Sequence, residues 1–393
     1  MSRGAITVEA RGGAKYDRAM TSYWLAEPAP PLAGGVGGGR VDVGIVGAGI
    51  TGCACALSLA EAGVSVRVVD ERRVAEGASG RNGGFALRGT ASPYDQVVAS
   101  FGRERALALW QWTEAELDAM AALAGDSFRR LGSLRLAVDA EEREDLRDEI
   151  EALWADGLEA EWIDAPDGPL TGKFSAAIHH PIDAAVHPAR LVRRLAERAS
   201  RAGAQFAEGR RVESLEELDA GTAVIATDGY PSGLLGELEG LIVPTRGQVI
   251  ATEPIPERAF ELPHYGRHGF DYWHQTEGGR IVAGGFRDVS IDREFTVEEA
   301  VTNEVQEALS AFVNGLLGRE LRVDYRWAGI FGLVLDFMPV VGPIPGQPSA
   351  WVAGGYSGHG NVLGFACGRL VARAILGDRD PLLDLFEPAR LLG

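Results

Sequence analysis

The order of apolar and polar residues predicts a chain that alternates strands with helices. The apolar run Val41–Val46 has the composition of a buried parallel strand. A helix is expected over 50–62, since Gly63 fits the position just after a helix C-terminus. A second strand over 64–69 follows and ends at Asp70. This first segment is therefore predicted to form a strand–helix–strand unit of a parallel sheet.

The rest of the pattern predicts a second region of different architecture. Helical periodicities occupy the middle of the chain, at 95–124, 141–156 and 190–202. Later segments alternate in the manner of an antiparallel sheet, at 245–252, 270–275 and 280–285. Near the C-terminus, a strand and a glycine-rich turn precede a helix through Ala374. The expected fold class is α/β, with a Rossmann-type lobe and a second lobe built on an antiparallel sheet plus helices.

Charge and composition narrow the possible partners. The 393 residues carry 38 Lys and Arg against 56 Asp and Glu, a formal net charge of −18. Such a surface repels phosphate backbones, so we expect no nucleic acid partner. The sequence has no apolar run of membrane-spanning length and no leader pattern, which predicts a cytoplasmic protein without a membrane span. Cys53, Cys55 and Cys367 are predicted to be packing residues in helices, with no disulfide and no metal site.

Residues 1–40 differ from the rest of the chain. The segment 25–40 is rich in Ala, Pro and Gly, a composition that does not hold a fold by itself. We expect a flexible N-terminal lead-in. The alternative is that Tyr23 and Trp24 dock on the body.

The candidate chemistry begins with the glycines between the first strand and its helix. Gly47, Gly49 and Gly52 form a G-x-G-x-x-G pattern. The first glycine allows a tight turn, the second lets a pyrophosphate approach the backbone, and the third lets helix and strand pack closely. Asp70 follows eighteen residues after Gly52, where a carboxylate binds the hydroxyls of an adenosine ribose. Together these features predict a dinucleotide cofactor.

A second glycine-rich segment narrows the cofactor to FAD. Residues 77–84 read Gly-Ala-Ser-Gly-Arg-Asn-Gly-Gly, which places polar donors on a loop without bulky side chains. The turn at 354–360 and the helix after it can aim N–H dipoles at the electron-rich side of a reduced flavin. The sequence has no second G-x-G-x-x-G pattern between a strand and a helix. That absence argues against a flavin monooxygenase or an NAD(P)H-linked reductase.

Seven blocks in order resemble the FAD-dependent D-amino acid oxidase superfamily. The similarity is greatest to its branch of bacterial γ-glutamylputrescine oxidase-like and glycine/sarcosine oxidase-like enzymes, and it covers nearly the whole chain from Val41. The blocks are 77–84, 186–192 (Val-His-Pro-Ala-Arg-Leu-Val), 224–230 (Val-Ile-Ala-Thr-Asp-Gly-Tyr), 244–248 (Pro-Thr-Arg-Gly-Gln), 326–329 (Arg-Trp-Ala-Gly), 336–342 (Asp-Phe-Met-Pro-Val-Val-Gly) and 355–360 (Gly-Tyr-Ser-Gly-His-Gly).

The resemblance implies two discontinuous domains and non-covalently bound FAD. The FAD-binding domain is expected from 41–90, 186–243 and 326–393, and the substrate domain from 91–185 and 244–325. Gly329, and Gly80 with Arg81, occupy the regions where some relatives attach the flavin through Cys or His. The expected cofactor-binding residues are Gly47, Ala48, Gly49, Thr51, Gly52, Asp70, Glu71, Arg72, Ala78, Ser79, Arg81, Asn82, Gly83, Gly84, Val212, Thr227, Gly229, Gly329, Gly358, His359, Gly360, Asn361 and Val362.

Some residues of the FAD-binding domain have a structural alternative. Val212 is expected to pair with adenine through its backbone, and the alternative is a plain core valine. Asp228 either supports the cofactor or forms a turn. His187 precedes Pro188 at the start of a helix and is expected to be a structural or capping residue, not a catalyst.

Three residues are candidates for the catalytic site. Arg88 lies just beyond the 77–84 loop, where relatives similar to sarcosine oxidase hold a substrate carboxylate with an arginine. The alternative for Arg88 is a surface residue. Tyr272 is expected to line the substrate pocket, with a core ring as the alternative. His359 is expected to contact the flavin, with a structural turn as the alternative.

The implied activity is FAD-dependent oxidation of a small-molecule amine or amino acid. Hydride would pass to flavin N5 and the imine would then hydrolyse. The chain has only Lys15 and Lys173, and neither is in the strand 280–285 where oxidase relatives carry an O₂-activating lysine. The electron acceptor is therefore O₂ or another compound, and the oligomeric state stays open. The alternatives are a dehydrogenase of a non-amine substrate such as a hydroxy acid, and a non-catalytic FAD-stabilised subunit of a larger complex.

Overall fold

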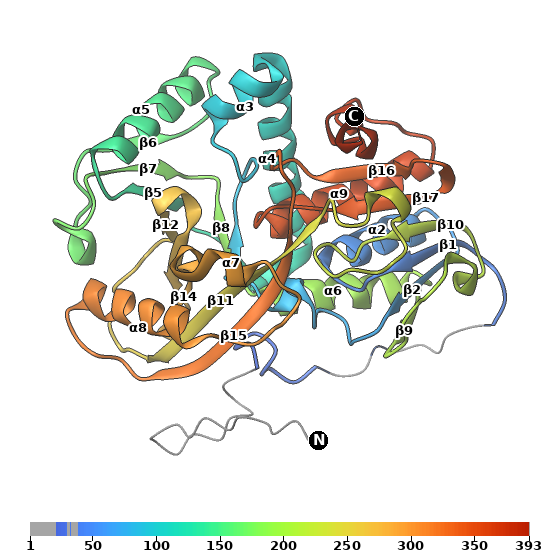
Figure 1. Cartoon of the computed structure of the whole chain (residues 1–393), viewed down its shortest axis with the longest axis horizontal. Helices are drawn as coiled ribbons and strands as arrows, with labels where there is room; N and C mark the ends of the chain where they lie inside the picture. The colour runs from blue at the N-terminus through green and yellow to red at the C-terminus, as the bar shows by residue number, and fades with distance from the viewer. Residues whose placement is uncertain (1–20, 30–31, 33–37, 393) are drawn as a thin grey trace.

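The structure is a computed structural model, and it describes residues 21–29, 32 and 38–392. Within these residues, the strands form three sheets of six, eight and three strands. The six-stranded and the eight-stranded sheets lie in two lobes side by side (Figure 1). Within the described part of the chain, no helix is both long and apolar enough to cross a membrane.

The six-stranded sheet confirms the Rossmann-type lobe. Its strands, in order across the sheet, are β16 (Val340–Ile344), β17 (Gln347–Gly354), β10 (Ala220–Ile225), β1 (Val41–Val46), β2 (Val66–Asp70) and β9 (Gln205–Glu208). All neighbours in this sheet pair in parallel except β16 and β17, which are antiparallel. β1 is central and buried because its residues are nearly all apolar. The carboxyl ends of β1, β2 and β10 therefore meet at one edge of the sheet.

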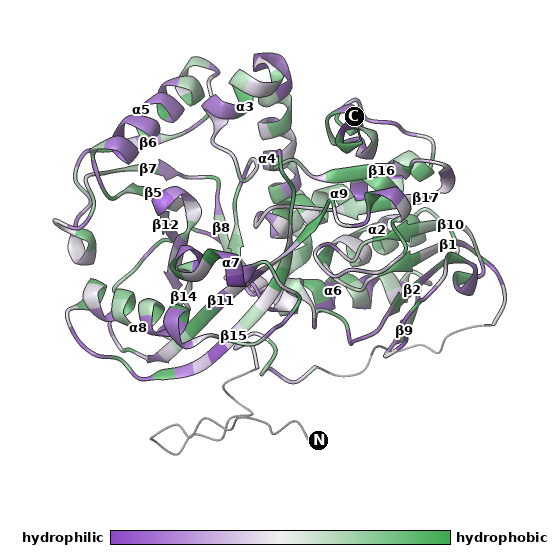
Figure 2. Ribbon diagram, in the orientation of Figure 1, coloured by the Kyte–Doolittle hydropathy of each residue, from purple (hydrophilic) through white to green (hydrophobic). Residues whose placement is uncertain are grey.

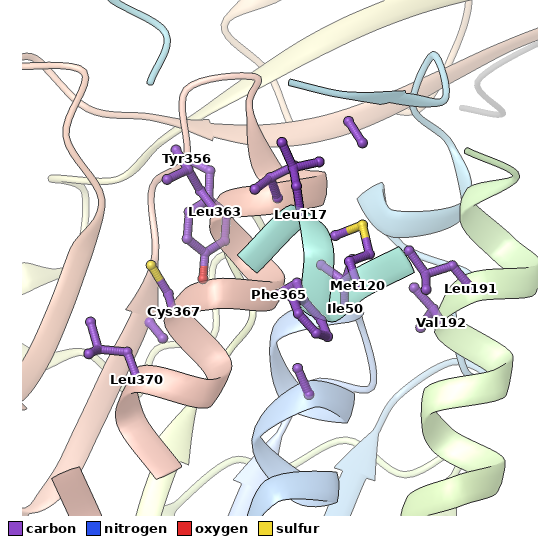
Figure 3. Close-up of a cluster of buried hydrophobic side chains, with 14 of the residues drawn as sticks. Ile50, Leu117, Met120, Leu191, Val192, Tyr356, Leu363, Phe365, Cys367 and Leu370 are labelled. Carbon is purple, nitrogen blue, oxygen red and sulfur yellow. The ribbon is translucent and has the colours of Figure 1, made fainter. Parts of the chain in front are cut away.

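Helices α2 (Ile50–Glu61), α6 (Pro188–Arg201) and α9 (Gly360–Ile375) pack together beside this sheet (Figure 1). The helix expected over 50–62 is thus confirmed, and Gly63 after it has φ +83°. Figure 3 shows the apolar cluster between these helices and α4 (Arg103–Ala124). Its labelled members are Ile50, Leu117, Met120, Leu191, Val192, Tyr356, Leu363, Phe365, Cys367 and Leu370. All three cysteines are free and buried in α2 and α9, which confirms their packing role.

The eight-stranded sheet forms the second lobe. Its strands, in order, are β15 (Val323–Leu333), β11 (Val243–Pro254), β14 (Arg280–Gly285), β13 (Asp271–Gln275), β12 (His264–Gly266), β5 (Ser133–Ala137), β7 (Ala176–His180) and β6 (Glu161–Ile163). All its neighbours are antiparallel except β12 and β5, which pair in parallel. Helix α8 (Asn303–Leu317) covers an apolar cluster around Trp273. The small third sheet consists of β3 (Phe85–Ala86), β8 (Ala184–Val186) and β4 (Phe128–Arg130).

Several expectations need correction. The helix expected over 95–124 is broken at Gly102, whose φ of +87° ends α3 (Tyr94–Phe101) before α4 begins. α5 (Ala140–Ala155) and α6 lie within one or two residues of the ranges expected for them. The domain boundaries expected at 186, 244 and 326 lie within β8, β11 and β15, and the division into two domains stays a prediction. The remaining short helices are α7 (Ile291–Glu294) and α10 (Leu383–Phe386).

The N-terminal segment is also different from a uniform flexible lead-in. Residues 1–20, 30–31 and 33–37 lie outside the described residues. Residues 21–29 dock on the body instead, and Trp24 is only 3% exposed. Figure 2 shows hydrophobic residues concentrated in the strands of the six-stranded sheet and in α9, whereas the peripheral α5 is largely hydrophilic. The Trp24 ring is buried in this apolar interior, and burial of its apolar surface stabilises the docking of residues 21–29.

Candidate active site

Two cavities lie end to end along the expected cofactor site. The first, here named the motif cavity, is bounded by the turns after β1, β2 and β10 and encloses about 770 Å³, its open mouth included. The second, the loop cavity, lies between the 77–84 loop and the eight-stranded sheet and encloses about 1540 Å³ in the same measure. Ala78 lines both cavities, so they adjoin.

Two glycines of the motif cavity stand where a side chain would overlap neighbouring protein atoms. Gly47 has φ +108°, and a Cβ there would lie 2.5 Å from the carbonyl oxygen of Ala226. A Cβ on Gly49 would lie 2.9 Å from Ser79 Oγ, which accepts a hydrogen bond from the Ile50 N–H at the start of α2. An oxygen acceptor thus already occupies the α2 N-terminus, the position that attracts a pyrophosphate. These observations fit the expected dinucleotide.

Asp70 stands at the end of β2 and lines the motif cavity. Its Oδ2 accepts the Ala48 N–H at 2.6 Å and its Oδ1 accepts the Arg72 N–H at 2.7 Å. Burial raises the pKa of Asp70, and these two backbone hydrogen bonds oppose that shift. The carboxylate therefore fixes the glycine turn, and each of its oxygens keeps acceptor capacity for a further donor such as a ribose hydroxyl.

Most of the expected cofactor residues line one of the two cavities. Those at the motif cavity are Gly47, Gly49, Asp70, Glu71, Arg72, Ala78, Ser79, Val212 and Thr227. Those at the loop cavity are Ala78, Arg81, Asn82, Gly83, Gly329, Gly358, His359 and Asn361.

Seven expected cofactor residues lie outside both linings, and these are Ala48, Thr51, Gly52, Gly84, Gly229, Gly360 and Val362. Two of them make packing contacts within the protein. The Thr51 hydroxyl lies 2.9 Å from the Tyr356 hydroxyl inside the helix cluster. A side chain on Gly52 would overlap the backbone of Gly47.

The 77–84 loop is joined to α9 through two amide side chains. Asn82 Nδ2 donates to Asn361 Oδ1 at 3.1 Å, and Asn361 Nδ2 donates to Asn82 Oδ1 at 3.1 Å. Gly329 of β15 lies so close to this loop that a Cβ there would be 2.8 Å from Arg81 Cβ. The loop, the α9 N-terminus and β15 thus enclose one end of the loop cavity.

Tyr272 and His359, two of the catalytic candidates, line the loop cavity as uncharged groups at pH 7. Burial raises the pKa of Tyr272 to about 12, so its hydroxyl stays protonated. Its ring lies against Gly83, where a Cβ would be 2.5 Å from Tyr272 Cε2. Burial lowers the pKa of His359 to about 4, so its imidazole stays neutral. His359 Nδ1 is buried and has no hydrogen-bond partner among the described residues.

Arg88 lines the same cavity, but most of its donors are occupied within the chain. Its Nη1 pairs with Glu114 Oε1 at 2.6 Å, and its Nη2 donates to the Glu159 carbonyl at 2.6 Å. Nη2 also lies 3.3 Å from His180 Nδ1. Nε is buried and has no partner among the described residues. The expected bidentate contact with a substrate carboxylate is therefore not available to Arg88 in this arrangement, and the surface alternative is wrong because the side chain is 2% exposed.

Arg287 is a cation of the loop cavity that the sequence analysis missed. It follows β14, and its guanidinium carbon lies 4.4 Å from the centre of the Phe270 ring and 5.8 Å from that of Phe331. The neighbouring Asp288 pairs with Arg267, and no ion pair joins Arg287 to a carboxylate within the described ranges. Burial lowers the pKa of Arg287, and Tyr272 opposes this shift. The sequence did offer one signal for this site, because Arg287 is a cation two residues after the strand expected at 280–285 in the substrate lobe.

The structure gives the contacts of two further residues that had structural alternatives. His187 is the N-cap of α6, where its Nδ1 accepts the Arg190 N–H at 3.2 Å, so the capping role is confirmed. Asp228 holds two distant segments at the edge of the motif cavity, because Oδ1 accepts the Gly355 N–H at 2.8 Å and Oδ2 accepts the Gly332 N–H at 3.0 Å. Among the described residues, no group of three or more His, Cys, Asp or Glu side chains could hold a metal ion.

Comparisons with known proteins agree with this geometry. The chain is 28% identical over 368 residues to gamma-glutamylputrescine oxidoreductase of Escherichia coli (strain K12), covering 86% of this chain and 84% of that protein. It is 28% identical over 386 residues to a glycine oxidase of Pseudomonas aeruginosa, covering 86% and 96%. The fold superposes on L-proline dehydrogenase of P. horikoshii with a TM-score of 0.74 at 22% identity, covering 90% of this chain and 98% of that structure.

The family assignment rests on both the pattern and its place in the fold. Residues 42–374 match the family of FAD dependent oxidoreductases, which includes the glycine motif, the 77–84 loop and the α9 N-terminus. The two adjoining cavities bring these segments together in the order that FAD requires. The chain therefore belongs to the DAO family of FAD-dependent oxidoreductases, and its cofactor is FAD.

Proposed function

We propose that this enzyme oxidises the C–N bond of an amine that also carries a carboxylate, such as an amino acid. The observation that carries the proposal is the pair Arg287 and Tyr272, which line the loop cavity together with the expected flavin contacts Asn82, Gly83 and His359. Bound FAD accepts the two electrons of this oxidation. The product imine then hydrolyses in water to a carbonyl compound and ammonia or a smaller amine.

Arg287 and Tyr272 orient the substrate in this proposal. The guanidinium of Arg287 offers two parallel N–H donors to a carboxylate, and the protonated Tyr272 hydroxyl adds a third donor. The flanking rings of Phe270 and Phe331 restrict the guanidinium and keep it from full hydration. Fixing the carboxylate places the C–H bond of the substrate in one orientation, which is the main contribution that a protein makes to such a reaction.

The cavity also favours the reactive, neutral form of the amine. Burial disfavours an ammonium ion unless a free carboxylate is nearby. Glu149 and Asp183 line the cavity, but Glu149 pairs with Arg135 and Asp183 accepts the Ser133 hydroxyl at 2.6 Å. His359 is neutral at pH 7, so it adds no charge to the cavity. No residue in this proposal needs to act as a strong base.

The names of two relatives support the same substrate class. Glycine and γ-glutamylputrescine both carry an amine and a carboxylate, and they differ greatly in length. Binding of the carboxylate that the two compounds share, with the remaining lining of the loop cavity free to differ between relatives, would account for both substrates.

An anaerobic screen tests the proposal. Purified holoenzyme is mixed with amino acids, N-methyl amino acids, γ-glutamyl amines, amines without a carboxylate, hydroxy acids and NAD(P)H, and flavin bleaching is followed at about 450 nm. The proposal expects bleaching by a carboxylate-bearing amine. Bleaching only by plain amines, by hydroxy acids or by NAD(P)H overturns it. No bleaching by any compound points instead to a non-catalytic subunit.

A further inference from the structure

The segment 21–29, here named the strap, is attached to the body by its charged end. The two carboxylate oxygens of Glu27 share the single Arg190 Nε–H, at 2.9 and 2.7 Å, and Oε2 lies 3.1 Å from His187 Nε2. Arg193 Nη1 donates to the Glu27 carbonyl at 3.0 Å. All three partners are on or next to the first turns of α6. The charged end of the strap is therefore held by residues at the start of α6, which lines neither cavity.

The other end of the strap contacts the 77–84 loop directly. Ser22 is fully buried, and its Oγ donates to the Gly80 carbonyl at 2.6 Å. Trp24 Nε1 donates to the Asn82 carbonyl at 2.8 Å. The Trp24 ring lies edge-on to His187 at 5.0 Å and parallel to His274 at 6.0 Å between ring centres. Both donors thus come from buried, closely packed side chains.

Four consecutive carbonyls of the loop are each fixed by a side chain from elsewhere in the chain. The Gly80 and Asn82 carbonyls accept from the strap, as described. The Arg81 carbonyl accepts from Trp327 Nε1 at 2.8 Å, and the Gly83 carbonyl lies 2.9 Å from His274 Nε2. In a trans peptide the following N–H points opposite to its carbonyl. Trp24 therefore fixes the direction of the Gly83 N–H and Trp327 that of the Asn82 N–H, and both of these residues line the loop cavity. Ser22 fixes the Gly80–Arg81 peptide, whose N–H donates to the Ala78 carbonyl at 3.1 Å.

The strap packs closely against two glycines of the loop. A Cβ on Gly80 would overlap the Ala75 carbonyl oxygen and lie 2.8 Å from Leu25 Cδ2, and a Cβ on Gly84 would lie 2.7 Å from the Val186 carbonyl oxygen and 3.0 Å from Trp24 Cζ2. Neither glycine lines either cavity. Their lack of a side chain admits the strap on the side of the loop away from the cavity lining.

We propose that the strap holds the 77–84 loop in its FAD-binding conformation, with Ser22 and Trp24 as positioning residues. This inference rests on the assignment of FAD as the cofactor. Because the strap connects to the loop through two hydrogen bonds, it acts on the flavin without touching it. FAD binding and strap docking therefore stabilise each other.

The test removes single donors and keeps the packing. Trp24→Phe keeps an aromatic ring and deletes the N–H, and Ser22→Ala deletes the hydroxyl. The control for loss of an indole N–H alone is Trp154→Phe in α5, where Trp154 is 48% exposed, its Nε1 donates to the Ala160 carbonyl at 2.8 Å, and the residue lines neither cavity. The dissociation constant of FAD is measured by titrating apoprotein, and the thermal midpoint is measured with and without FAD. The visible spectrum of the bound flavin is recorded as well.

The expected result separates positioning from general stability. Trp24→Phe and Ser22→Ala should each weaken FAD binding about fivefold, the effect of one lost hydrogen bond, and should shift the flavin spectrum. Trp154→Phe should leave both unchanged even where it lowers the thermal midpoint. Wild-type affinity and spectrum in both strap variants overturn the inference while leaving the FAD assignment intact. Failure of the wild-type chain to bind FAD would overturn both.

Discussion

Replacing Arg88 and Arg287 separately by methionine should separate stability from substrate binding. The Arg88 side chain is 2% exposed, and its partner Glu114 is 22% exposed. Removing one member of a buried pair costs about 3–5 kcal/mol, since it leaves the other charge without a partner. Glu114 regains part of its hydration through its exposed edge, so we expect Arg88→Met to lower the free energy of unfolding by about 3 kcal/mol.

Arg287→Met should have the opposite balance of effects. Its guanidinium contacts two rings and no described carboxylate, so the loss is a cation–π contact of about 1 kcal/mol. A bound carboxylate, however, loses its charge partner, which costs about 2–3 kcal/mol of binding. That corresponds to a rise of about 30- to 150-fold in the half-saturating substrate concentration. Arg287→Lys should recover only part of the loss, because an ammonium makes no bidentate contact.

Two measurements on the same proteins show which of the two arginines stabilises the fold and which binds the substrate carboxylate. Urea unfolding gives the stability of each variant, and anaerobic stopped-flow reduction at varied substrate concentration gives half-saturation and the limiting rate. The reasoning is refuted if Arg88→Met unfolds like the wild type and binds substrate weakly while Arg287→Met binds substrate normally. Arg88 would then be the carboxylate anchor, as the sequence first indicated.

Three further predictions concern the cofactor and pH. Heat or acid precipitation should release all flavin into the supernatant, since the three buried cysteines line neither cavity; flavin that stays on the band in a denaturing gel contradicts this. Asp70→Ala should weaken FAD binding by about 1–3 kcal/mol in a titration of apoprotein. The surface variant Asp42→Ala serves as the control, and an unchanged affinity in Asp70→Ala would show that Asp70 is not part of the ribose site. Burial raises the pKa of Asp183 from 3.8 to about 6, so the unfolded chain releases this proton first and stability falls by up to about 3 kcal/mol as pH rises from 4 towards 7. Asp183→Asn, neutral at every pH, should unfold at higher urea than the wild type at pH 8 and not at pH 4; equal differences at both pH values would disprove the shifted pKa.

The sequence by itself determined the cofactor half of the site. The glycine turn, the α2 N-terminus and Asp70 lie within one strand–helix–strand unit, and their geometry depends on local backbone conformations that glycine permits. The order of the later blocks then indicated the family. The sequence did not predict the helix break at Gly102, because the apolar periodicity continues on both sides of it. Only the φ of +87° in the structure shows that the helix ends there.

Only the tertiary structure decided the substrate half. Whether an arginine is free depends on partners far away in sequence, and Arg88 is satisfied by Glu114 and Glu159, which come from other elements. Arg287 is open to a ligand because its neighbour Asp288 pairs with Arg267 instead. The sequence offered docking of Trp24 on the body as an alternative but could not name its partner, since the Trp24 indole meets the Asn82 carbonyl across 58 positions of sequence. Periodicity shows which side of an element is buried, but the packing of distant elements determines which buried polar groups meet, and therefore which charges remain for a substrate.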